Sequence, residues 1–392
     1  MTPLRALRAP GVGGLLALAL VARLPVTAIG LLLVLQARAL GATYALAGLT
    51  TGAFAIGAAL GAVLQARLVD RIGQSVVLLT GSACTAGVLV AITRVPASHS
   101  ALLVPLACLC GAAVPPIGPC LRAIWSRTLS QEQRRSAFSL EASLQELAFL
   151  FGPLIFISLA TSTSPSTSLL ALAAVLFATS FGFALTSQAR ATRRGATRVR
   201  ARSAPLRNGP VRTLLAASFV MGVAISSVEI GIVAFADHEG AKGATGMLYG
   251  LWIVASLLAG LLDGYRRRKR HPVAEAQLLM LALAVAGMLL ALAPSVPLLA
   301  LALVPAGAAV APLFSRVFGL TGDVAPPEGL TESYAWTTAG LLGGVSIGAS
   351  ITGALDTALG VHACFLVGTV AGGAGAAMLL MRGGAFRLAT RQ

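Results

Sequence analysis

The sequence predicts an all-α membrane protein with twelve transmembrane helices in two pseudo-symmetric six-helix bundles. Three observations lead to this prediction: a strongly apolar composition, apolar blocks of membrane-crossing length, and an arginine-rich segment that divides these blocks six and six. Of the 392 residues, 57% are hydrophobic and only 11% are charged, against about 25% charged residues in average soluble proteins. So few charges cannot cover a water-soluble chain of this length, which excludes a soluble enzyme and a disordered protein.

The apolar residues occur in unbroken blocks, whereas the strands of a membrane β-barrel would alternate apolar and polar residues. Blocks of about 18–25 residues match the length that a helix needs to cross a bilayer. The twelve predicted spans lie near residues 11–36, 45–66, 75–94, 101–121, 137–160, 168–187, 211–235, 244–264, 274–293, 296–315, 332–354 and 359–381.

The basic residues lie almost entirely in alternate connections between the spans. On the other side only Arg38, Arg94 and Lys242 are found. Because cytoplasmic loops carry the excess of Lys and Arg, both termini are predicted to be cytoplasmic and the location to be the cell membrane. The net charge of +16 is then explained by topology and by contact with anionic lipid, rather than by binding to nucleic acid.

A faint repeat supports the division into halves. The segment from Gly111 to Pro116 in the fourth span returns, half a chain length later, as Gly307 to Pro312 in the tenth span, and Arg122 and Arg316 follow the two copies. A chance match of low-complexity sequence is the alternative. We expect an N-terminal bundle over residues 1–188, an Arg-rich cytoplasmic linker over 189–210 and a C-terminal bundle over 211–392. Parallel six-span repeats are typical of one large class of transporters.

Two short motifs carry a family resemblance. The segment from Leu68 to Gly73, between spans 2 and 3, resembles the cytoplasmic signature of the major facilitator superfamily, and Gly152-Pro153 in span 5 is similar to a signature of its proton-coupled drug antiporters. The resemblance implies the major facilitator fold and alternating access through a cavity lined by spans 1, 4, 7 and 10. It also implies a latch in which Asp70 meets the start of span 11 near Glu332. The predicted gating residues are Asp70, Arg71, Gly73, Arg122, Gly152 and Pro153.

Placing a charged side chain inside a bilayer costs free energy, so each such residue is expected to have a structural or functional role. Arg23 in span 1 and Glu146 in span 5 lie at similar depths from the same membrane face, so they are expected to pair. The pair is either a structural ion pair or part of a substrate or proton site. Glu141 lies near the depth of Arg122 and is expected to pair with it, largely as a structural contact, and Gln145 shares the helix face of Glu141.

Span 7 carries a polar stripe formed by Ser218, Gly222, Ser226 and Glu229. A carboxyl group in the membrane without a cation beside it favours the protonated form, so Glu229 is either a proton carrier or a neutral group that joins helices. Only 5% of the residues are aromatic. Among them, Tyr249, Trp252 and Trp336 are candidates for contact with an apolar or cationic ligand. Anchoring at the membrane interface is the alternative.

Together these residues predict a secondary active transporter that moves a small apolar or amphipathic molecule, with proton-coupled efflux as the leading hypothesis. The alternatives are an importer or uniporter of a polar or anionic metabolite, and a membrane receptor that does not transport. The sequence shows no nucleotide-binding loop, no metalloprotease motif and no hydrolase GxSxG motif in a suitable setting. We therefore expect no enzymatic activity, no cofactor, no metal and no nucleic-acid partner. The expected partners are the substrate, protons and membrane lipid, and we expect a monomer.

Overall fold

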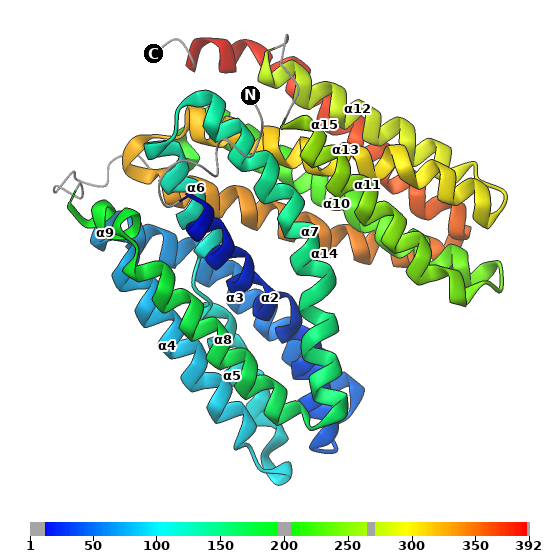
Figure 1. The fold of residues 1–392 in the computed structure, drawn as a ribbon. Coiled ribbons are helices and arrows are strands. Elements are labelled where there is room, and N and C mark those ends of the chain that lie inside the picture. Colours follow the sequence, from blue (N-terminus) through cyan, green and yellow to red (C-terminus); the bar gives the residue numbers. More distant parts are fainter. Residues whose placement is uncertain (1–11, 195–204, 265–270, 390–392) are drawn as a thin grey trace. The chain divides into compact units, whose positions relative to one another are not determined.

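A computed structural model describes residues 12–194, 205–264 and 271–389. All regular elements within these ranges are helices (Figure 1). The α-helices are α2 (Val12–Ala39), α3 (Tyr44–Ile72), α4 (Gln74–Thr93), α5 (Leu103–Ala113), α6 (Ile117–Thr128), α7 (Gln131–Ser162), α8 (Pro165–Leu185), α9 (Ser187–Arg194), α10 (Gly209–His238), α11 (Thr245–Asp263), α12 (Pro272–Ala291), α13 (Val296–Val324), α14 (Leu330–Leu359) and α15 (Val361–Ala389). Four short 3-10 helices lie between them: η1 (Ala97–Leu102), η2 (Pro205–Arg207), η3 (Lys242–Ala244) and η4 (Pro327–Gly329).

The described chain contains 12 helical segments long and apolar enough to cross a membrane, which confirms the predicted number and the all-α class. Most boundaries agree with the sequence to within a few residues. The second, fourth and tenth segments run further than expected, to Ile72, Thr128 and Val324. They do so because a helix continues past the last apolar residue until a turn ends it. At the second segment that turn is Gly73, whose φ of 95° strongly favours glycine.

By their contacts, the described residues divide into two compact units. Those within Leu7–Arg127 and Leu147–Ala201 form the N-terminal unit, and those within Thr128–Glu146 and Arg202–Gln392 form the C-terminal unit. The first half of α7 thus packs with the C-terminal unit, although it precedes the linker in sequence. The boundaries predicted at residues 188 and 210 stay predictions, and residues 195–204 of that linker lie outside the described part of the chain.

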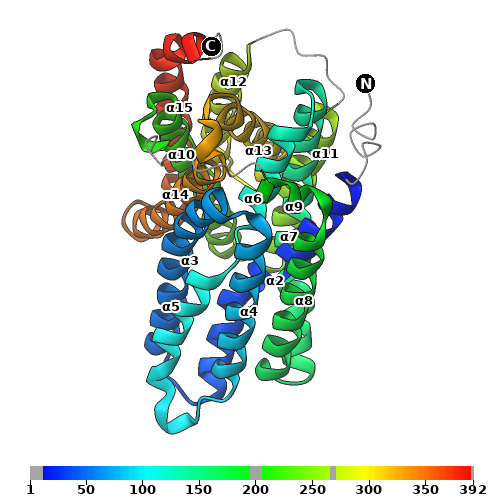
Figure 2. The same ribbon diagram turned by 90° about the vertical axis from the view of Figure 1, so that its left-hand side faces the viewer.

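Each unit repeats the same helix pairs. In the N-terminal unit α3 packs on α5, α4 on α8 and α2 on α8 (Figure 2). In the C-terminal unit the corresponding spans make the same pairs, with α11 on α13, α12 on α15 and α10 on α15. Spans 2 and 4, and likewise spans 8 and 10, are therefore neighbours in their own units. This agreement supports the repeat that the sequence indicates.

The fourth span is broken at two consecutive prolines. Helix α5 ends at Ala113 and α6 begins at Ile117, with Pro115 and Pro116 in the gap. Gln65 of α3 closes the break, because its side-chain Nε2 donates to the carbonyl oxygen atoms of Ala112 (2.8 Å) and Val114 (2.9 Å). The backbone groups that proline leaves unpaired are thereby satisfied within the membrane.

Candidate functional site

Two acidic side chains inside the spans of the C-terminal unit are bound by hydroxyl groups. Tyr249 Oη of α11 donates to Glu229 Oε1 of α10 over 3.0 Å. Ser256 Oγ of α11 donates to Glu146 Oε1 of α7 over 3.0 Å. Helix α11 therefore supplies the donor to both carboxylates, one from the fifth span and one from the seventh. We call Glu146, Glu229, Tyr249 and Ser256 the acidic cluster.

The two carboxylates of the acidic cluster are bound through the same helix, α11. Within the described residues of the C-terminal unit, their hydrogen-bond partners are neutral hydroxyls and not Lys or Arg side chains. A carboxyl group whose bound partners are hydroxyls, with no cation among them, is not held in its ionised form by an opposite charge. The cluster is thus able to bind and release a proton, which is the chemistry that the sequence suggested for Glu229.

An aromatic pair adjoins the acidic cluster. The rings of Tyr249 and Trp252 meet edge to face with their centroids 5.7 Å apart. Trp252 is only 3% exposed, so it does not face lipid as an interface anchor would. Its Nε1 atom has no hydrogen-bond partner among the described residues. Trp336 lies elsewhere, where its Nε1 donates to Glu332 near the start of α14.

The residues of the polar stripe of span 7 contact two different helices. Gly222 packs against the backbone of Leu341 in α14, and Ser226 lies beside Gly348 of the same helix. These small residues therefore serve helix packing between α10 and α14. Glu229, at the end of the stripe, instead contacts Tyr249 of α11.

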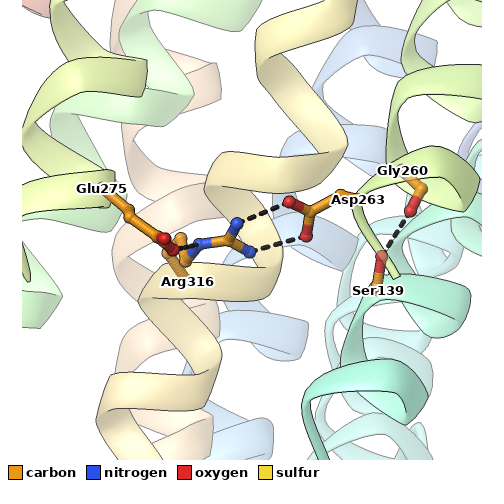
Figure 3. Close-up of polar contacts among 5 residues, drawn as sticks. All are labelled: Ser139, Gly260, Asp263, Glu275 and Arg316. Atoms are coloured by element: carbon orange, nitrogen blue, oxygen red, sulfur yellow. Dashed lines mark hydrogen bonds and ion pairs between the residues drawn. The ribbon is translucent and has the colours of Figure 1, made fainter. Parts of the chain in front are cut away.

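Serine residues extend the contact between α7 and α11 beyond the acidic cluster. Ser139 Oγ donates to the carbonyl oxygen of Gly260, and Ser143 Oγ donates to that of Leu257 over 3.2 Å (Figure 3 shows the first bond). A side chain at Gly260 would collide with Ser143. Sequence reasoning missed these serines, because a serine inside an apolar helix gives no signal of what it contacts.

A buried ion cluster joins α11, α12 and α13. Arg316 of α13 binds both oxygen atoms of Asp263, at 2.7 and 2.5 Å, and its Nε donates to Glu275 over 2.6 Å (Figure 3). Arg316 is 5% exposed and Asp263 8% exposed. Two-point binding of this kind fixes geometry as well as charge. Asp263 was not predicted from the sequence. It lies at the end of span 8 as Asp70 lies at the end of span 2, so the half-length repeat could have indicated it.

The N-terminal unit carries the counterpart of this ion cluster. Asp70, at the end of α3, lies 3.7 Å from Arg127 of α6. Spans 2 and 4 are thus joined by an acid and an arginine, as spans 8 and 10 are. Arg71 is exposed, and Gly73 forms the turn into α4. The latch between Asp70 and the start of span 11 joins residues of different units and stays a prediction.

Two predicted arginines lie together in the N-terminal unit. The side chains of Arg23 in α2 and Arg122 in α6 both reach the position that a Cβ atom on Gly118 would take. Arg122 is buried, as is Glu141, whereas Gln145 is half-buried. The predicted pairs of Arg23 with Glu146 and of Arg122 with Glu141 join residues of different units and stay predictions.

The second half of α7 packs closely on α2 within the N-terminal unit. Gly152 leaves no room for a side chain beside Thr27 and the backbone of Leu24. Thr27 Oγ1 also donates to the carbonyl oxygen of Ala148 over 3.1 Å. Pro153 lies inside α7, where it cannot donate a backbone hydrogen bond. The Gly152-Pro153 motif therefore allows spans 1 and 5 to approach closely.

Twelve spans, two similarly packed sets of helices and acidic groups inside the membrane segments are features of the multi-pass secondary transporters. A sequence profile of the Major Facilitator Superfamily matches residues 15–284. The chain belongs to the Major Facilitator Superfamily, as its motifs predicted. It is a membrane transporter and not an enzyme.

Solved structures share this fold at low sequence identity. The human organic anion transporter MFSD10 (TETRAN) is 18% identical with a TM-score of 0.72, and the match covers 94% of this chain and 98% of that one. The fucose:proton symporter FucP of E. coli is 14% identical with a TM-score of 0.72, over 95% and 98% of the two chains. A bacterial homologue of the iron transporter ferroportin, in an outward-facing state, is 14% identical with a TM-score of 0.75, over 95% and 99%. No curated protein sequence matches the chain.

Proposed function

We propose that this transporter exports a small apolar or amphipathic molecule by alternating access, in exchange for protons. The observation that carries the proposal is the acidic cluster, in which two carboxylates from different spans receive their hydrogen bonds from hydroxyl groups. A carboxylate held by a fixed ion pair would not readily change its protonation state, because the cation stabilises its charge. Hydroxyl donors leave Glu146 and Glu229 free to gain and lose a proton as access to water changes.

The aromatic pair supports the class of substrate. Tyr249 is half-buried and offers ring surface beside the carboxylate of Glu229, with Trp252 packed against its ring, and aromatic faces bind both apolar and cationic groups. The outward direction is supported by the similarity of Gly152-Pro153 to the motif of drug antiporters. We further propose that the protein lies in the cell membrane as a monomer, in contact with anionic lipid, with both termini in the cytoplasm.

The test is transport driven by an imposed pH gradient in proteoliposomes. A panel of fluorescent amphipathic dyes, such as ethidium and rhodamine 6G, is first screened in cells with and without the protein, before and after a protonophore collapses the gradient. Glu229→Gln, which keeps size and polarity but cannot ionise, is expected to abolish the dependence of dye transport on the pH gradient. Glu328→Gln, at an exposed acid outside the cluster, is the matched control and is expected to behave as the unchanged protein.

A specific observation favours a second candidate, the import or facilitated diffusion of an anionic metabolite. Arg23 and Arg122 lie together inside the membrane segments of the N-terminal unit, and a pair of guanidinium groups suits a carboxylate or phosphate. The direction of flux separates the two functions. Under an imposed proton gradient an exporter moves its dye against the proton flow, whereas a symporter moves an anionic probe, such as fluorescein, with it.

A further inference from the structure

We propose that a cavity in the C-terminal unit binds a zwitterionic group in which an ammonium lies close to a phosphate, as in phosphoethanolamine. The cavity lies between the first turns of α7, the start of α12 and the last turns of α13, and we call it the α7–α13 cavity. Its empty volume is about 310 Å³, including the open space at its mouth. The polar residues that line it are Gln131, Arg134, Ser315, Arg316 and Asp323. The inference does not depend on the proposed function, because none of these residues belongs to the acidic cluster.

An accessible ion pair forms part of the wall of the cavity. Arg134 Nη2 of α7 binds Asp323 Oδ1 of α13 over 2.5 Å. This pair is less buried than the pair of Arg316 with Asp263, so a polar ligand reaches it by the route that water takes. Arg134 uses one nitrogen atom for this contact, whereas its guanidinium group carries five N–H donors. A carboxylate likewise accepts several hydrogen bonds. Both partners are therefore able to bind a ligand.

The opposite charges of this pair select the kind of ligand. An anion that binds Arg134 also lies beside the negative charge of Asp323, and a cation that binds Asp323 lies beside the positive charge of Arg134. Each single charge is thus repelled as well as attracted. A zwitterion places its anionic group on Arg134 and its ammonium group on Asp323, so that every charge has an opposite neighbour. The pair therefore favours a zwitterion over either simple ion.

The second arginine of the cavity already has its partners. Arg316 binds both oxygen atoms of Asp263, and its Nε donates to Glu275 (Figure 3). Withdrawing Arg316 from these buried bonds would leave two acidic groups without their cation in a poorly hydrated site. Arg316 is therefore a fixed part of the wall whose charge is balanced before a ligand arrives. The anionic group of the ligand is left with Arg134 as its charged partner.

A buried hydroxyl group in the cavity indicates a polar ligand. Ser315 is 3% exposed, and its Oγ has no hydrogen-bond partner among the described residues. Serines inside helices commonly donate to a carbonyl oxygen of their own helix, as Ser143 and Ser333 do here. Leaving a buried hydroxyl unpaired costs free energy. We therefore expect Ser315 to form a hydrogen bond with a group that enters the cavity.

The depth of the cavity in the membrane indicates which zwitterion is present. The fifth span begins at Ser136, the ninth begins at Pro272 and the tenth ends at Val324, and the cavity lies where these ends meet. The ends of spans lie at the level of the lipid head groups, whose zwitterions carry a phosphate, and an arginine fork suits phosphate oxygens. Phosphoethanolamine has this chemistry, whether a membrane lipid or a soluble ester carries it.

The test compares the ethanolamine head group with two close relatives. Thermal unfolding of the full-length protein is measured in detergent with glycerophosphoethanolamine, glycerophosphocholine or glycerophosphoglycerol, and in nanodiscs whose lipids carry the same three head groups. Choline has no N–H group to donate, and glycerol has no positive charge. The ethanolamine form is expected to raise the unfolding temperature by several degrees at about 100 times its Kd. The other two are expected to bind at least about tenfold more weakly.

Variants of the lining test the position of the site. Ser315→Ala should weaken binding of the ethanolamine form about tenfold. Nothing lies within 4 Å of the Cβ position of Gly319, which also lines the cavity, so Gly319→Leu should fill the cavity and abolish binding. Asp323→Asn leaves Arg134 without its anion, so the preference should pass to the glycerol head group. Glu328→Gln, at an exposed acid outside the cavity, is the matched control and should bind as the unchanged protein does.

The source of the head group follows from the same measurements. A response in nanodiscs alone supports the inference with a lipid as the ligand, and a response to the soluble ester as well supports it for the head group itself. Equal responses to all three head groups overturn the inference, and the absence of any response overturns it in favour of a cavity that holds only water. A response that persists in both Ser315→Ala and Gly319→Leu places the binding elsewhere and also overturns it. Unfolding of each variant without ligand verifies that it is folded.

Discussion

Gly111 and Gly307, half a chain length apart, make the same contact in the two units. A side chain on Gly111 would collide with the backbone of Phe54 in span 2, and one on Gly307 with the backbone of Trp252 in span 8. Each glycine is the point where its span lies directly on the neighbouring helix. The repeated sequence around them thus reflects a repeated close approach of backbones, which small residues allow in membranes.

The first prediction concerns this close approach. Gly307→Ala is expected to lower stability by about 1–3 kcal/mol, because the new methyl group has no room beside Trp252. Gly319 lies in the same helix with nothing within 4 Å of its Cβ position. Gly319→Ala is therefore the control and should leave stability unchanged or slightly raised. Thermal unfolding in detergent measures both, and equal losses would contradict the argument from packing.

The second prediction compares a buried ion pair with a more exposed one. Asp263→Asn leaves Arg316 without its two-point partner and should cost about 3–5 kcal/mol. Asp323→Asn breaks the pair between Asp323, which is 21% exposed, and Arg134, which is 16% exposed. This loss should be smaller, because water reaches these two side chains more readily than it reaches Asp263 and Arg316. Unfolding of both variants by heat gives the comparison. If burial sets the cost of breaking an ion pair, Asp263→Asn must lose more stability than Asp323→Asn.

The third prediction concerns the broken fourth span. Gln65→Leu keeps the volume but removes the donor to Ala112 and Val114, which should cost about 1–3 kcal/mol through the unpaired carbonyl groups. Thr80, whose hydroxyl bonds only within its own helix, provides the control through Thr80→Val. Thermal unfolding is again the measurement. A Gln65→Leu protein as stable as the Thr80→Val control would show that the break does not need the hydrogen bonds from Gln65.

The fourth prediction separates the roles of the aromatic pair. Tyr249→Phe keeps the ring beside Trp252 but removes the hydroxyl that binds Glu229, so it should change the pH profile of transport and leave KM nearly unchanged. Trp252→Leu keeps an apolar side chain but removes the ring, so it should raise KM several-fold with the pH profile retained. Initial rates of dye transport, measured over a range of dye concentration and pH, test the split. If both variants change KM and leave the pH profile unchanged, Tyr249 has no role in proton coupling.

The sequence predicted the fold better than it predicted the site. Apolar blocks are long and membrane helices must satisfy their own backbone bonds, so the number of spans followed directly from composition. Glu146, Glu229 and Tyr249 were found because charged and aromatic residues stand out against an apolar background. Their partner Ser256 was not found, since a hydroxyl in an apolar helix is common and its neighbours depend on rotation and depth.

The sequence by itself determined the all-helical class, the twelve crossings, the half-length repeat and the family. These properties depend on length, hydropathy and local motifs, which are written along the chain. Only the tertiary structure decided that Arg316 binds Asp263, that α7 meets α11 through serines, and that Gln65 closes the fourth span. Such contacts join residues that are distant in sequence, and they depend on which helix faces turn toward each other when the spans pack.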